Sequence, residues 1–256
     1  MRFLSIFLLL TMPLLASCSR TLSSVGAEAV SAGVQTIENK GSDTIVNLAL
    51  AWAEAYMSIH PDVRISVTGG GSGTGIAAMI NGTVDIANAS REMKPEEIAE
   101  AKKNGIFPKE FVVARDAIAV VVNPSNPVQQ LTLQQISDIY TGKITNWREV
   151  GGEDRPIVLL SRESNSGTYV YFLENVVRMG QSDSDLLFSP NTLAHDSQGP
   201  YVLPSVQAVN DGSYPISRPL YMYTAGEPTG QVKAYLDWIL GDGQKLVAEL
   251  GFVPLR

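Results

Sequence analysis

Hydrophobic and polar residues follow two spacings along the chain, one typical of helices and one typical of strands. Between residues 45 and 59 the apolar positions recur every three or four residues, which predicts a helix. Residues 63–68 alternate instead, with Val63, Ile65 and Val67 on one side, which predicts a strand. The same reasoning predicts further strands at 85–89, 117–122, 157–161 and 220–223, and further helices at 76–80, 95–104, 133–140, 168–179, 231–240 and 244–250.

The order of these elements indicates the fold class. Strands alternate with helices and are joined by short turns that contain glycine or serine, which is typical of an α/β architecture with mainly parallel sheets. The spacing of Thr132 and Gln135 is that of a capping box, and it marks the start of one predicted helix. Residues 181–212 follow neither period, so no element is predicted there.

The first 17 residues are expected to be an export signal. Arg2 supplies a positive start, and residues 3–16 form an apolar run shorter than the roughly 20 residues that cross a bilayer. The sequence Leu15-Ala16-Ser17-Cys18 resembles a bacterial lipobox, in which cleavage falls before a cysteine that is then lipidated. Cys18 would carry diacylglycerol and a further acyl chain such as palmitate, and would anchor the protein at the outer side of the cell membrane. The alternative is a buried cysteine in an ordinary signal peptide.

Composition narrows the class of partner. Residues 18–34 contain the cysteine and a stretch rich in serine, alanine and glycine, which we interpret as a flexible tether. The net charge of −7 argues against nucleic acid or anionic lipid as a partner. Two histidines and a single cysteine without ligand spacing make a poor metal site, so neither a metal nor another cofactor is expected.

Three turns share one design, and together they point to an anion site. Each adjoins a predicted strand, contains hydroxyl side chains and opens a helix, where backbone N–H groups and the helix dipole favour negative charge. Arg162 lies four residues before the third turn, and its planar guanidinium can pair with two oxygens of a tetrahedral anion. The turns are Ser42-Asp43-Thr44, Gly71-Ser72-Gly73-Thr74 and Ser166-Gly167-Thr168.

Each of these features has a plainer explanation when it is taken alone. A turn with serine and glycine is most often a simple helix cap, and an isolated arginine most often forms a surface ion pair. The combination of three such turns with Arg162 is what favours a small oxyanion as the ligand.

Two patterns in the sequence resemble those of enzymes. Residues 73–78 fit the dinucleotide pattern G-x-G-x-x-A, but the acidic residues about 20 positions later fall inside a predicted helix. His195-Asp196 resembles part of a hydrolase triad, but the sequence has no G-x-S-x-G elbow to supply the nucleophile. A non-enzyme is therefore expected.

At these turns the sequence resembles the phosphate-binding proteins of the bacterial Pst transport system, a branch of the periplasmic binding proteins. The resemblance implies two α/β domains joined by crossing strands, with the ligand in the cleft between them. Domain one would comprise residues 35–116 and 224–256, and domain two residues 117–223, with crossing strands at 117–122 and 220–223. The stretches that carry the resemblance are Gly41-Ser42-Asp43-Thr44, 69–75, 85–91, 136–152, 162–168 and 214–223.

The resemblance also implies a ligand and the residues that contact it. The ligand would be inorganic phosphate, which the protein would deliver to the membrane subunits of an ABC permease. The protein itself would be a monomer. Better-known family members carry an aspartate where this chain has Ser90, so the discrimination of phosphate from sulfate is left open. Another oxyanion (sulfate, molybdate or tungstate) and a sensing or adhesion lipoprotein on the same fold are the alternatives. The expected contacts are Ser42, Asp43, Thr44, Ser72, Gly73, Ser90, Arg162, Ser166, Gly167 and Thr168.

Overall fold

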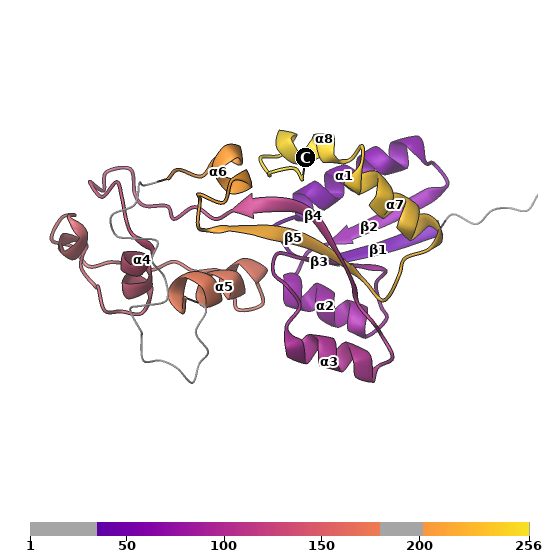
Figure 1. Cartoon of the computed structure of the whole chain (residues 1–256), viewed down its shortest axis with the longest axis horizontal. Helices are drawn as coiled ribbons and strands as arrows, with labels where there is room; N and C mark the ends of the chain where they lie inside the picture. The colour runs from indigo at the N-terminus through magenta and orange to yellow at the C-terminus, as the bar shows by residue number, and fades with distance from the viewer. Residues whose placement is uncertain (1–34, 180–201, 256) are drawn as a thin grey trace, which may run out of the picture. The chain divides into compact units, whose positions relative to one another are not determined.

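The structure is a computed structural model that describes residues 35–179 and 202–255 (Figure 1). These residues belong to one compact unit of the chain. The expected export signal, Cys18, the tether and His195-Asp196 lie outside the described residues.

One five-stranded sheet organises the described residues. Its strand order is β2-β1-β3-β5-β4, and β1 pairs in parallel with both β2 and β3. β5 pairs antiparallel with β3 and with β4, so the other four strands share one direction, β5 runs against them, and the sheet is mixed. β5 enters the sheet from the opposite end because the chain leaves along β4 and returns along β5. The strands are β1 (Gln35–Gly41), β2 (Val63–Thr68), β3 (Ile86–Ala89), β4 (Lys109–Ala117) and β5 (Ser217–Thr224).

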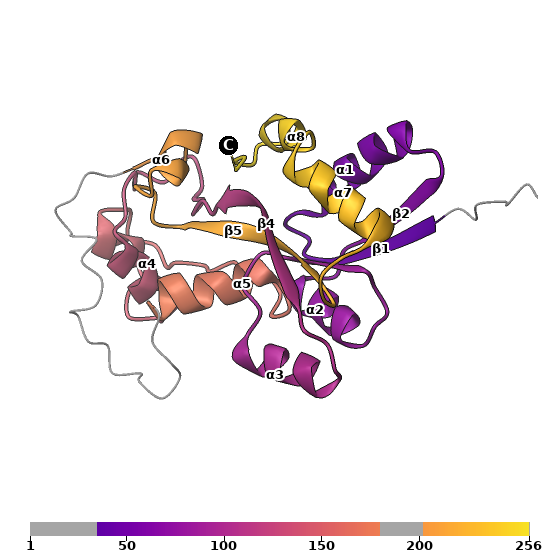
Figure 2. The same cartoon turned by 45° about the vertical axis from the view of Figure 1, so that its right-hand side comes forward.

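Helices cover both faces of this sheet (Figures 1 and 2). α1 (Val46–Ile59), α7 (Gly230–Leu240) and α8 (Gln244–Glu249) build one core, in which Trp52 is fully buried and donates from Nε1 to the carbonyl of Gly243 at 2.7 Å. α2 (Ser72–Ile80) and α3 (Pro95–Lys103) build the other core around Ile76, Met79 and the ring of Tyr221. The two apolar faces of the sheet are thereby removed from water.

The segment between β4 and β5 has an apolar cluster of its own. Ile136, Val176, Ala208, Tyr214 and Ile216 form its centre. β4 leads into this segment and β5 leads out of it. The elements of the segment are α4 (Leu133–Tyr140), the 3-10 helix η1 (Trp147–Val150), α5 (Gly167–Phe172), the π-helix η2 (Leu173–Val177) and α6 (Val206–Asn210).

Most predicted helices and several predicted strands are confirmed. The capping box is present, since Thr132 Oγ1 accepts from Gln135 N at 3.1 Å and Gln135 Oε1 accepts from Thr132 N at 2.8 Å. α2 begins at Ser72, inside the glycine-rich turn and earlier than expected. None of the helices in the described residues has the length and apolar character needed to span a membrane.

Two predicted strands are wrong. β4 ends at Ala117, and residues 118–122 form no strand, with Val121 85% exposed. Residues 157–161 are likewise irregular, and Val158 is 79% exposed. An apolar run becomes a strand only where a neighbouring strand satisfies its backbone groups. Among the described residues, Ile118 donates to the carbonyl of Ile216 and Ile157 to that of Thr145, but no ladder of pairs continues from either bond.

Glu97 connects the start of α3 to the buried Arg91. Its carboxylate accepts from Arg91 Nη1 and Nη2 at 2.8 and 2.7 Å and from the Lys94 backbone N–H at 2.8 Å. Burial alone would raise the pKa of Glu97, but these hydrogen bonds and the charge of Arg91 outweigh it, so the pKa lies below its ordinary value. A carboxyl group with a lowered folded-state pKa stabilises the fold at neutral pH, and this stabilisation is lost as pH falls through the folded-state pKa.

Replacing Glu97 with Gln should therefore lower the free energy of unfolding by about 2 kcal/mol at pH 7, since hydrogen bonds to charged groups contribute roughly 1.5–3 kcal/mol. The difference from the wild-type protein should shrink on acidification because the wild-type carboxylate is then protonated as well. Urea unfolding at neutral and acidic pH measures both values. Glu96→Gln, an exposed carboxylate in the same helical turn, is the control, with an expected loss of about 0.5 kcal/mol. An equal loss for Glu97→Gln at both pH values would contradict the linkage.

Candidate functional site

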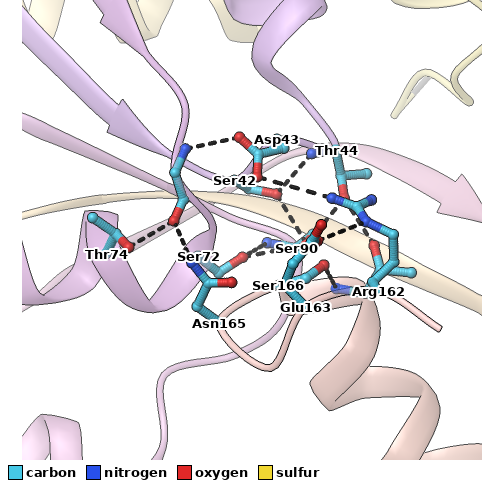
Figure 3. A network of polar contacts seen from close by, with 12 residues as sticks. Ser42, Asp43, Thr44, Ser72, Thr74, Ser90, Arg162, Glu163, Asn165 and Ser166 are labelled. Atoms are coloured by element: carbon cyan, nitrogen blue, oxygen red, sulfur yellow. Dashed lines mark hydrogen bonds and ion pairs between the residues drawn. The ribbon is translucent and has the colours of Figure 1, made fainter.

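The three predicted turns meet at one place, together with a fourth segment that follows β3 (Figure 3). Ser42 and Thr44 lie between β1 and α1, Ser72 is the first residue of α2, and Ser90 follows β3. β1 and β3 are adjacent parallel strands, so the segments that follow them leave the sheet at the same edge. The turn before α5 comes from the segment between β4 and β5 and completes the group with Thr168.

Hydroxyl groups form the centre of this site. Ser90 Oγ lies 3.0 Å from Ser42 Oγ, 3.3 Å from Ser72 Oγ and 3.4 Å from Thr44 Oγ1. Thr44 Oγ1 lies 2.9 Å from Thr168 Oγ1, which joins two segments more than a hundred residues apart in sequence. We call these five side chains, Ser42, Thr44, Ser72, Ser90 and Thr168, the hydroxyl cluster. Each hydroxyl has one proton to donate, so the cluster offers several donors to a single bound group.

Glycine allows the turn before α5 to approach the other segments closely. A Cβ atom added to Gly167 would lie 2.2 Å from Ser72 Oγ and 2.3 Å from Ser90 Oγ. A Cβ atom on Gly71, which has a φ of +91°, would lie 2.6 Å from the carbonyl oxygen of Asn165. Asn165 Nδ2 also donates to the carbonyl of Gly70 at 3.0 Å. The two glycines therefore set how closely the hydroxyl cluster can assemble.

The remaining predicted residues lie at the margin of the cluster. Arg162 is 45% exposed, with Nη2 3.9 Å from Asp43 Oδ2 and Nε 3.3 Å from Glu163 Oε2. Asp43 Oδ1 accepts from the backbone N–H of Gly70 at 2.8 Å. Ser166 is the N-cap of α5, and its Oγ accepts a hydrogen bond from the backbone N–H of Thr168 at 3.2 Å. Gly73 lies beside Asn165 at the edge of the cluster. Arg162 is thus near the site but, in this structure, is engaged by carboxylates.

Arg218 on β5 is a site residue that the sequence analysis missed. Its side chain is 1% exposed, and Nη2 donates to Thr168 Oγ1 at 2.7 Å and to Thr44 Oγ1 at 3.4 Å. Nη1 donates to the carbonyl of Ser90 at 2.7 Å. The sequence signal was a charged residue within the strand that leads out of the segment between β4 and β5, and only the register of that strand shows which groups it faces.

Asp116 compensates the charge of Arg218. The two residues face each other in the β4–β5 pair, and Arg218 Nη2 lies 3.1 Å from Asp116 Oδ2. Burial lowers the pKa of Arg218, and the Asp116 carboxylate opposes this shift, so the guanidinium remains charged at neutral pH. The ring of Tyr171 lies 5.4 Å from the guanidinium carbon and contributes a cation–π contact.

A cavity of about 440 Å³ borders the site and is separate from the hydroxyl cluster. Arg218 lines the cavity and also donates to Thr44 and Thr168 of the cluster. The cavity wall carries Glu92, Glu96 and Glu174 beside Arg91 and Lys94, a mixture of charges that does not favour an anion. Within the described residues no three His, Cys, Asp or Glu side chains are arranged to hold a metal ion.

Comparison with known proteins places this geometry in context. A family model described as a PBP superfamily domain matches residues 26–185 and 182–243. The chain is 32% identical to Protein SphX of Synechococcus elongatus, over 84% of this chain and 76% of the relative. It is also 32% identical to the phosphate-binding protein PstS of Bacillus subtilis, over 84% of this chain and 79% of the relative.

A solved structure has the same fold. It is that of a putative phosphate ABC transporter substrate-binding protein with bound phosphate from Clostridium perfringens. The two proteins are 34% identical with a TM-score of 0.71, and the match covers 87% of this chain and all of the other. The two-domain binding-protein fold expected from the sequence is thereby confirmed.

Replacing Asp116 with Asn should lower the free energy of unfolding by about 2–3 kcal/mol, because it leaves the buried Arg218 guanidinium without its carboxylate. Chemical denaturation measures the loss. Asp154→Asn is the matched control, since Asp154 pairs with Arg148 at 3.2 Å on an exposed surface and such pairs contribute about 0–1 kcal/mol. Similar losses for the two variants would show that Arg218 does not depend on Asp116.

Proposed function

We propose, from the premise that this chain belongs to the PBP superfamily and to its PstS phosphate-binding proteins, that it binds inorganic phosphate outside the cytoplasmic membrane and delivers it to an ABC importer. The observation that carries the proposal is the hydroxyl cluster, in which four separate segments of the chain direct hydroxyl groups at one point. Relatives named as phosphate-binding proteins, and a neighbour with phosphate bound, support the same ligand.

The binding step follows from the donors that the cluster holds. In the structure the hydroxyls bond to one another, and a tetrahedral oxyanion would accept the same protons together with the N–H groups at the starts of α1, α2 and α5. Arg162, released from Asp43 and Glu163, would add a bidentate contact at the margin. No covalent bond is made or broken, so the protein acts as a carrier and not as an enzyme.

Closure of the cleft would couple binding to transport. Thr168, Gly167 and Arg162 come from residues 117–223, whereas Ser42, Thr44, Ser72 and Ser90 come from residues 35–116. An anion held by both sets of donors favours the closed arrangement over an open one by the energy of those contacts. The permease would recognise the closed monomer and receive the ligand when it opens.

Another oxyanion is the second candidate, and Ser90 is the observation that favours it. A carboxylate at this position would accept a hydrogen bond from protonated phosphate, whereas sulfate carries no proton to donate. The hydroxyl of Ser90 is a weaker acceptor than a carboxylate. A sensing or adhesion role would use the same cleft, and adjacent permease and ATPase genes would distinguish transport from that role.

Calorimetric titration of the chain from residue 35 onward, first freed of carried-over ligand, tests the proposal with phosphate and then with sulfate. We expect saturable phosphate binding, and Arg162→Ala should weaken it at least tenfold because charged hydrogen bonds contribute roughly 1.5–3 kcal/mol each. Arg155→Ala, which removes an exposed arginine paired with Glu153, is the control and should bind as the wild-type protein does. Absence of phosphate binding would reject the function, and unchanged affinity of Arg162→Ala would remove Arg162 from the site.

Anchoring through Cys18 is a further part of the proposal. It rests on the apolar run at residues 3–16 and on the lipobox-like sequence that ends at Cys18. Acyl chains on this cysteine would hold the protein at the membrane through about 0.8 kcal/mol per buried CH₂ group.

Replacing Cys18 with Ala should release the protein from membranes, or block its processing, without changing the affinity of residues 35–256 for phosphate. Fractionation of cells that express the full chain, followed by detection of the mature form, measures the first effect. A Ser17→Ala variant, which keeps the cysteine, should remain membrane-bound. A Cys18→Ala variant that is still processed and still membrane-bound would reject the anchor.

A further inference from the structure

Asn165 connects residues 117–223 to residues 35–116 by a hydrogen bond that involves none of the cluster's hydroxyl groups. It lies in the turn before α5, and its Nδ2 donates to the carbonyl oxygen of Gly70, in the turn before α2, at 3.0 Å. We infer that Asn165 is a positioning residue, which stabilises the closed arrangement of the cleft without contacting the bound anion. This inference rests on the proposed function, because it concerns closure around the same anion site.

The carbonyl that Asn165 contacts is already held in place by its own turn. Gly70 and Gly71 have φ values of +119° and +91°, which only glycine adopts readily, and they turn the peptide between them. The N–H of Gly71 donates to the carbonyl of Gly41 at 3.0 Å, and the carbonyl of Gly70 accepts from Thr74 Oγ1 at 2.6 Å. The contacts of Thr74 and Asn165 meet at this one oxygen (Figure 3). Asn165 therefore uses the second acceptor position of an oriented carbonyl.

The backbone of Asn165 also lies directly against Gly71. A Cβ atom added to Gly71 would lie 2.6 Å from the carbonyl oxygen of Asn165 and 3.3 Å from its Cγ. Separation of the two turns by even 1 Å would lengthen the Asn165–Gly70 contact beyond the range of a hydrogen bond, which ends near 3.2 Å. The bond is therefore made only when the two turns are together.

Other polar contacts across the cleft differ from this one. Those of the hydroxyl cluster and of Arg162 would be exchanged for contacts to the anion when it binds. Lys94 Nζ lies 3.9 Å from Glu174 Oε1, and these side chains are 37% and 47% exposed, so their pair contributes little. A carbonyl oxygen carries partial negative charge and does not attract an anion. The bond between Asn165 and Gly70 is therefore not displaced by the ligand and favours closure both before and after binding.

A contact made only in the closed arrangement changes the apparent affinity of the site. It increases the fraction of the protein that is closed, and the affinity for the anion rises by the same factor while the open form predominates. The anion leaves only after the cleft opens, so the dissociation rate constant should fall as the closed form is stabilised. Both effects are independent of any bond between Asn165 and the ligand.

Binding measurements on residues 33–256, which belong to one compact unit, test the first effect. Asn165 is exposed, so Asn165→Ala leaves the apolar cores intact. This variant should bind phosphate about two- to tenfold more weakly and release it faster by a similar factor, as expected for the loss of one hydrogen bond between uncharged groups. Asn175→Ala is the matched control and should bind as the wild-type protein does, since Asn175 Nδ2 donates to the carbonyl of Tyr171 within residues 117–223.

Distance measurements without ligand test the effect on closure. Residues 33–256 contain no cysteine, so Glu100→Cys on α3 and Gln134→Cys on α4, two exposed positions, accept one spin label each. Paramagnetic relaxation then reports the fraction of ligand-free protein that is closed. Asn165→Ala should lower this fraction by about the same factor as the affinity, whereas Asn175→Ala should leave it unchanged.

Unchanged phosphate affinity of Asn165→Ala would overturn the inference. Weaker binding with an unchanged closed fraction would overturn it as well, because Asn165 would then act on the anion itself. Both of these results leave phosphate binding intact as the function. Failure of the wild-type protein to bind phosphate would instead reject the proposed function, and the closed fractions of the ligand-free variants would still decide the role of Asn165.

Discussion

A charged guanidinium without access to water must be surrounded by acceptors, and this requirement connects the parts of the structure around Arg218. Asp116 on β4, the carbonyl of Ser90 after β3, and the hydroxyls of Thr44 and Thr168 each satisfy part of it. These groups come from the sheet, from the turn before α1 and from the turn before α5. Since an unpaired buried charge costs several kcal/mol, the four segments are held in one arrangement by a single side chain.

The site reconciles an acidic protein with an anionic ligand. The net charge of −7 is spread over the whole chain, whereas the hydroxyl cluster lies where the helix starts and a buried cation converge. In a region of low dielectric, nearby donors and one fixed charge outweigh distant surface carboxylates that solvent screens. Local donors, and not net charge, therefore indicate the kind of ligand that this fold accepts.

The sequence predicts much of this arrangement because local rules apply to it. Helical periodicity predicted α1 and α7 to within one residue, and the capping box predicted the start of α4. The hydroxyl-bearing turns were identified as helix starts, and the structure brings Ser42, Thr44, Ser72, Ser90 and Thr168 together. The strands expected at 117–122 and 157–161 failed because hydrophobicity does not reveal whether a partner strand is present. Arg218 was missed for a related reason, since its role depends on the β4–β5 register and on residues more than a hundred positions away.

The order of strands in the sheet also has a consequence for how the chain folds as it is synthesised. β4 pairs only with β5 among the described strands, and Trp52 on α1 is covered by α7, α8 and the carbonyl of Gly243. Residues 35–117 therefore leave the ribosome with an unpaired strand edge and an uncovered aromatic core, and residues 217–249 supply both missing parts. Residues 35–117 stay incomplete until residues 217–249 have been synthesised as well, which keeps this part of the chain open to proteins that bind unfolded segments for most of that time.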